Sequence, residues 1–190
     1  MSFYEESSIV ITPNAYKAGT LYAVVPTSGL ADMDVTRATA ATRVDENGLV
    51  NYAEALGSEL VTNGDFATDT DWTKGTGWVI ANGKATHTGS TGNLNQNIGI
   101  SGKTVLLTFE VLTIDDGVCN VIDADISTIA LASFSTIGVK TVTLNFVGNS
   151  IGLRSNSTNC SIDNVSVKEV IKDNVPRIDY TGGGCPHILA

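Results

Sequence analysis

Residues 57–170 alternate between short apolar runs and turn residues, a pattern that few folds can accommodate. The turns NGK, SGK, DDG and VGNS separate runs that recur at close spacing. Eight runs are strand candidates: GWVIA, KATHT, LNQNIGI, KTVLLTFEVLT, VCNVIDADI, VKTVTLNFV, SIGLRS and CSIDNVSVKEV. Short strands at regular spacing with turn signals between them are typical of antiparallel all-β domains. About eight strands in roughly 110 residues predict a jelly-roll β-sandwich over residues 57–170.

The alternation is clearest in TVTLNF, where Val142, Leu144 and Phe146 share one face and Thr and Asn occupy the other. This period of two indicates a strand with one buried side. Composition agrees, because only 16% of the residues are charged, against roughly 25% in a typical soluble domain. The polar surface must then come from Thr, Ser, Asn and Gly, which favour strands and turns.

The last strand candidate contains a break in this alternation. In SIDNVSVKEV, the positions in phase with Ile162 include Asn164 and not Val165. An extra residue in one strand of an antiparallel pair shifts the phase in this way. We therefore predict a β-bulge near Asp163.

The segments that flank the predicted sandwich differ from it in composition and in the length of their apolar runs. Residues 1–56 contain the short runs SSIVITP and TLYAVVPT, each ended by proline, a turn at ENG, and the start of the one helix candidate, NYAEALG at 51–57. Isolated short strands are marginal in water, so we expect an extended N-terminal arm that needs a partner surface. Residues 171–190 form a short Gly/Pro-rich C-terminal segment. There Pro176, the GGG run and Pro186 predict no regular element after Tyr180.

Charge and cysteine usage limit the partners. The formal net charge is −9, and no basic patch occurs, so we expect neither nucleic acid nor an anionic membrane as a partner. The many Asp residues are open to two interpretations, solubility or calcium binding. The three cysteines lack metal-ligand spacing, and at most one pair could form a disulfide.

The N-terminus has no basic region followed by an apolar one, and no apolar run is long enough to span a membrane. We therefore expect the protein to be synthesised in a cytoplasm, and to function outside it if it is carried on a particle.

The two tryptophans lie six positions apart and have two interpretations. Exposed aromatic rings stack on sugars, and a neighbouring carboxylate binds hydroxyls, which makes Trp72 and Asp71 the carbohydrate-binding candidates. Alternatively the rings fill the core of the sandwich. Trp78 shares a strand face with Ile80, so we expect it inside. Trp72 lies in the polar loop TDTDWTKG, so we expect it at the sandwich edge and partly exposed.

The remaining polar motifs do not indicate an enzyme. The acidic run IDDGVCNVIDADIS does not have EF-hand spacing, and we expect a turn followed by a strand whose Asp residues face water. Nothing places two carboxylates across a cleft for glycoside hydrolysis. His87 lies among threonines, where we expect it to be solvated. No nucleophile elbow, phosphate loop or paired metal-ligand motif occurs.

Residues 57–170 resemble the jelly-roll type of carbohydrate-binding module. The matching residues are LVTNGDF with a Trp shortly after it, then GTGWVIANGKATHTG, and the closing SIDNVSVKEV. This resemblance implies a structural calcium ion held by Asp163, with Asn63 and Asp65 at the opening strand. The family often has an acidic residue just after the opening motif, and this chain has Ala67 there.

The flanks resemble a frame found in tailed-phage virion proteins, particularly head and tail fibre proteins. The matching residues are VTRATAATRVDENGLV before the sandwich and NVPRIDYTGGGCPHIL after it. The resemblance implies a virion structural protein, a homo-oligomer, that docks on other virion proteins through its N-terminal arm. The sandwich would be inserted in this frame and would display a glycan-binding surface. The alternatives are a structural decoration or spacer without a ligand, and a carbohydrate-binding module associated with an enzyme.

Overall fold

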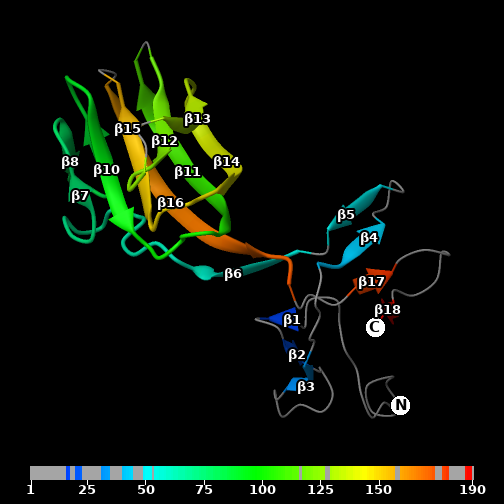
Figure 1. The fold of residues 1–190 in the computed structure, drawn as a ribbon. Coiled ribbons are helices and arrows are strands. Elements are labelled where there is room, and N and C mark those ends of the chain that lie inside the picture. Colours follow the sequence, from blue (N-terminus) through cyan, green and yellow to red (C-terminus); the bar gives the residue numbers. More distant parts are fainter. Residues whose placement is uncertain are drawn as a thin grey trace, which may run out of the picture. The chain divides into compact units, whose positions relative to one another are not determined.

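The computed structural model describes residues 16–17, 20–22, 31–34, 40–44, 49–52, 54–115, 117–126, 129–156, 159–173, 177–179 and 187–189. The chain divides into two compact units (Figure 1), one of residues 58–169 and one that combines residues 1–57 with 170–190. Within the described ranges, no helix has the length and apolar character needed to cross a bilayer.

The larger unit is a sandwich of two antiparallel sheets, as predicted. One sheet has the order β13-β12-β15-β10-β7, with bounds Ala130–Phe134, Cys119–Asp123, Ser150–Ser155, Gly92–Asn97 and Thr73–Lys74. The other has the order β14-β11-β16-β9-β8, with bounds Gly138–Asn145, Thr104–Ile114, Cys160–Ile171, Ala85–His87 and Trp78–Ile80. Strand β6, Ala55–Glu59, pairs with β16 in this second sheet. Figure 1 shows the chain passing repeatedly from one layer to the other, as in a jelly roll.

The core lies between the two sheets and follows from the alternation of the strands. In β11, Val105, Leu107 and Phe109 face inward and are fully buried. The predicted inward positions of β14 are confirmed, since Leu144 is buried and Phe146 just beyond the strand is 2% exposed. Leu94, Ile151 and Leu153 meet them from the five-stranded sheet. Burial of such side chains stabilises the fold by about 1.5–3 kcal/mol each.

The predicted bulge is present in β16. Thr108 lies opposite Ser166 and Glu110 opposite Asp163, so β16 has one more residue than β11 between these pairs. Asn164 has a φ of 54°, in the left-handed region that Asn tolerates better than most residues. The extra residue restores Val165 to the core.

The opening and closing segments of the sandwich lie together, as predicted. The N–H of Leu60 donates to the carbonyl of Val167 at 2.9 Å, and the N–H of Val165 donates to the carbonyl of Gly64 at 2.8 Å. The Glu59 carboxylate adds a bond from the Val167 N–H at 2.7 Å. The helix predicted over 51–57 is wrong, because this pairing places Ala55–Glu59 in a strand and Val50–Tyr52 forms strand β5.

Strand β13 was not predicted. Its sequence ALASF has small residues and no alternation, and most of its side chains are exposed. It forms because its backbone pairs with β12 from Cys119 to Ile122.

The smaller unit joins both flanks of the sequence. Strands β1, β2 and β3, at Tyr16–Lys17, Thr20–Tyr22 and Ala31–Asp34, form a three-stranded sheet, and β4, Thr42–Val44, pairs with β5. Ala41 is buried and packs against Ala55 and Ile171, so the N-terminal and C-terminal flanks contact each other. Lys172 lies over the ring of Tyr52, 4.8 Å from its centroid.

One prediction for the C-terminal segment is wrong. Strand β17, Arg177–Asp179, pairs with β18, His187–Leu189, so a regular element does follow Tyr180. The Gly and Pro residues separate the two strands in sequence but leave each strand's backbone able to pair. The predicted run SSIVITP and the turn at ENG lie outside the described residues.

Candidate functional site

A row of polar side chains crosses the outer face of the five-stranded sheet. In β10, Leu94 points into the core, so Asn93 and Asn95 point outward. Asn93 lies opposite Arg154 of β15, and Arg154 lies opposite Asn120 of β12. Residues directly opposite each other point to the same side of a sheet. Three neighbouring strands, with β15 between β10 and β12 in Figure 1, therefore place two amides and a guanidinium in one line. Asn120 is buried, and its Oδ1 accepts the Ser133 hydroxyl at 2.6 Å, so Asn93 and Arg154 are the accessible members of the row.

A groove of about 370 Å³ lies at one end of this row, against the edge strand β7. Its lining residues are small, hydroxylated, amide or cationic, with no carboxylate among them: Thr73, Lys74, Gly75, Thr76, Thr91, Gly92, Asn93, Asn95 and Arg154. The side-chain oxygen of Asn95 is a buried acceptor with no hydrogen-bond partner among the described residues. Threonine, asparagine and arginine side chains are among the groups that form hydrogen bonds with ligand hydroxyls.

Two glycines allow the chain to close this edge of the groove. A Cβ at Gly92 would lie 1.9 Å from the carbonyl oxygen of Thr76, and one at Gly75 would lie 2.7 Å from that of Asn93. Trp78 holds the same edge from inside, since its Nε1–H donates to the Gly92 carbonyl at 3.0 Å. A larger residue at Gly92 would force these two segments apart.

Trp78 occupies the core as predicted, at 5% exposure. It lies opposite His87 of β9, and the two ring centroids are 5.2 Å apart. The prediction that His87 is solvated is wrong, because its side chain shares the inward face with Trp78 and is fully buried. Its Nε2 is 2.8 Å from the carbonyl oxygen of Ser90.

Trp72 is also in the core, so the prediction that it is partly exposed is wrong. Its ring is 6% exposed and packs on Phe66 with a centroid distance of 5.4 Å. Its Nε1–H donates to the carbonyl of Asn63 at 3.1 Å. A ring enclosed in this way is not available to stack on a sugar. Asp71 is exposed beside it, but its Oδ2 accepts the Thr70 hydroxyl at 2.6 Å.

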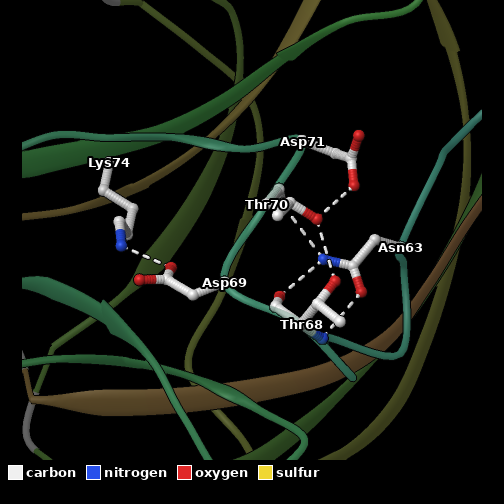
Figure 2. A network of polar contacts seen from close by, with 6 residues as sticks. All are labelled: Asn63, Thr68, Asp69, Thr70, Asp71 and Lys74. Atoms are coloured by element: carbon white, nitrogen blue, oxygen red, sulfur yellow. Dashed lines mark hydrogen bonds and ion pairs between the residues drawn. The ribbon is translucent and has the colours of Figure 1, made fainter.

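A network around Asn63 holds the loop that carries Trp72 (Figure 2). The Asn63 amide donates to the carbonyls of Thr68 and Thr70 at 2.7 and 3.0 Å, and its oxygen accepts the Thr68 N–H at 3.2 Å. Lys74 and Asp69 form an ion pair at the other side of the same loop. Asn63 has a φ of 53°, which favours Asn or Gly there. Sequence reasoning did not find this role, which depends on the loop folding back over one residue.

The three residues considered for calcium are near the junction of the opening and closing segments. The Asn63 side chain is already engaged in the loop, since its nitrogen donates two hydrogen bonds and its oxygen accepts one. The Asp163 carboxylate accepts the N–H of Asn164 at 2.6 Å, and Asp65 accepts the N–H of Ala67 at 3.4 Å. No group of three His, Cys, Asp or Glu side chains suited to a metal occurs in the described part of the chain.

The carboxylates at the end of β12 and just after it accept hydrogen bonds from the backbone of a neighbouring turn. Asp123 was expected to face water but is 5% exposed, since its Oδ2 accepts the N–H groups of Val147 and Gly148 at 3.0 and 2.8 Å. Asp125 is exposed, and its Oδ2 accepts the Asn149 N–H at 2.6 Å. Hydrogen bonds from the Ser150 hydroxyl and then the Asn149 N–H hold the pKa of the Asp125 carboxyl below its usual value.

Comparison with known proteins adds a resemblance at the level of shape. No model of a protein family matches this chain, and no curated protein matches it in sequence. A solved structure described as "CBM4 structure and function" matches with a TM-score of 0.40 and 15% identity, covering 57% of this chain and 98% of that one. A likeness at this level carries no argument about the ligand. The β-sandwich itself rests on the strand pairings above.

Proposed function

We propose that this protein is a non-enzymatic structural component of a phage virion, a fibre or decoration protein, which displays its sandwich and binds glycans through the groove beside β7. The observation that carries the glycan part is the chemistry of the groove. Arg154, Asn93 and Asn95 project from adjacent strands onto one surface, and the buried side-chain oxygen of Asn95 has no hydrogen-bond partner in the part of the chain that the structure describes. A rigid sheet holds the backbone of these residues in place before binding, which reduces the entropic cost of binding to that of ordering the side chains.

The way in which the sugar would bind follows from the burial of the rings. Trp72 and Trp78 are both in the core, so recognition would rest on hydrogen bonds from amides, hydroxyls and the guanidinium. Hydrogen bonds of this kind compete with water, and each contributes about 0.5–1.5 kcal/mol. We therefore infer weak binding at one site, strengthened by several copies of the sandwich on one particle.

The virion part is supported by the two flanks. The residues that resemble the phage frame lie before and after the sandwich in sequence, and both flanks belong to one unit. If the two flanks pack together, the sandwich inserted between them can be displayed away from the particle. The combined flanks would then dock on other virion proteins. The absence of a carboxylate among the groove residues supports binding without hydrolysis, since glycosidases use paired carboxylates.

The second candidate is a spacer that binds nothing. It is favoured by the lack of an exposed aromatic ring: every Trp and Phe in the described part of residues 58–169 is buried or, for Phe134, half-buried against Phe109. In this account the groove is an ordinary strand edge.

Two measurements test the proposal. Peptide mass spectrometry of gradient-purified phage particles should detect the chain in a fixed ratio to the other structural proteins, and its absence from the particles would contradict the virion assignment. A glycan array probed with the purified full chain should show bound sugars. A blank array at high protein density, with the chain present in particles, would support the spacer.

A further inference from the structure

Two cysteines meet inside the sandwich, one from each sheet. Cys119 is the first residue of β12 in the five-stranded sheet, and Cys160 is the first residue of β16 in the opposite sheet. Both belong to the core, with 0% and 1% exposure. Both are free thiols in this structure.

The strand connections bring the two thiols to the same end of the core. Cys119 lies opposite Ser155, the last residue of β15. From Ser155 the chain crosses to the other sheet and begins β16 at Cys160. The Cys160 thiol forms hydrogen bonds with both Cys119 and Ser155. Three side chains from neighbouring strands therefore converge on one spot between the sheets.

The environment makes the two sulfurs chemically unequal. The hydrogen bond with Cys160 and then burial raise the pKa of the Cys119 thiol well above its usual value. The hydrogen bond from Cys119 lowers the pKa of Cys160. The thiolate is the nucleophile in disulfide exchange, so this hydrogen bond favours Cys160 as the attacking thiol.

We propose that Cys119 and Cys160 form a disulfide that links the two sheets when the protein enters an oxidising environment. With a small disulfide such as oxidised glutathione, the Cys160 thiolate attacks one sulfur, releases one glutathione thiolate and forms a mixed disulfide. The Cys119 thiolate then displaces the second glutathione. Overall, two thiols and one glutathione disulfide give one protein disulfide and two glutathione thiols.

This disulfide would form after folding and would stabilise the folded sandwich. The thiols stay reduced in a cytoplasm and oxidise outside it. Because both are buried, the oxidant reaches them only when the end of the sandwich opens transiently, so the reaction is slow. The new bond would close a loop of roughly 40 residues, which restricts the unfolded chain and raises the melting temperature.

The test uses the full chain with Cys185→Ser, which leaves only this thiol pair. Incubation with oxidised glutathione under native conditions should lower the mass by about 2 Da and remove both titratable thiols. Peptide mapping should then find the 119–160 link. The melting temperature should rise by about 5–15 °C and return on reduction. Cys119→Ala in the same background should show no such rise.

Three results would overturn the proposal. The first is two free thiols after prolonged oxidation at a temperature where the sandwich end opens. The second is a glutathione adduct that never resolves to the internal bond. The third is a 119–160 disulfide that leaves the melting temperature unchanged or lower, because the bond would then be strained and would not lock the fold.

Discussion

The indole N–H of Trp72 donates a hydrogen bond to the backbone carbonyl of Asn63, 3.1 Å away. This bond ties the polar loop between the two residues to the core, and it explains how a tryptophan surrounded in sequence by Thr, Asp and Lys becomes buried. The loop closes over the ring, and Phe66 packs beside it.

We predict that Trp72→Ala destabilises the sandwich about as much as Trp78→Ala, by about 3–5 kcal/mol each, because both remove a buried ring and leave a cavity. Urea unfolding followed by circular dichroism measures both. Trp72→Phe is the control: it keeps much of the bulk, loses the bond to Asn63, and should cost about 1–2 kcal/mol. A Trp72→Ala protein as stable as wild type would mean that the ring is not part of the core.

Asn63 should hold the loop through both its side chain and its backbone. Asn63→Ala loses three hydrogen bonds and must keep a φ of 53° without the tolerance of Asn. We expect a loss of about 1–3 kcal/mol in the free energy of unfolding. Asn63→Gly loses the same bonds but accepts the backbone angle, so it should be less damaging. Equal stability of all three proteins would show that the network is incidental.

The features that depend on a local sequence pattern were predicted correctly. The features that depend on contacts between segments distant in the sequence were missed. The period of two at Val142 and Leu144 identified the inward face of β14, and the phase break beside Asp163 located the bulge. Trp72 and His87 were misplaced because their sequence neighbours are polar, while their burial comes from residues elsewhere in the fold. No pattern in the sequence indicates that Arg154 lies opposite both Asn93 and Asn120.

Calcium binding is a further prediction, from the resemblance of the opening and closing strands to carbohydrate-binding modules. Since the Asn63 amide is used in the loop, the ion would take Asp163, Asp65 and backbone carbonyl oxygens. Calcium should then raise the melting temperature and a chelator should lower it, because a ligand that binds only the folded state stabilises it. Asp163→Ala should respond to neither. A wild type indifferent to calcium and chelator would exclude the site.

Asp125 should contribute to stability in a pH-dependent way. Its folded pKa is lowered from the usual 3.8 by the bonds from Ser150 and Asn149. A carboxyl whose pKa is lower in the folded state stabilises that state at any pH above its pKa in the unfolded chain. This stabilisation is lost as the pH falls through the pKa of the folded state. The urea midpoint of wild type should exceed that of Asp125→Asn at about pH 6, and the gap should close by about pH 2. A gap independent of pH would place its origin elsewhere.

The most direct test of the proposed function is calorimetric titration of a glycan found on the array into the full chain and its groove variants. We predict that Arg154→Ala and Asn93→Ala each weaken binding at least about tenfold, since one charge-assisted or two neutral hydrogen bonds are worth that much. Their melting temperatures should stay close to that of wild type, and Thr143→Ala, exposed on the other sheet, should bind as wild type does. Unchanged affinity in both groove variants would contradict the assignment of the glycan site to this groove.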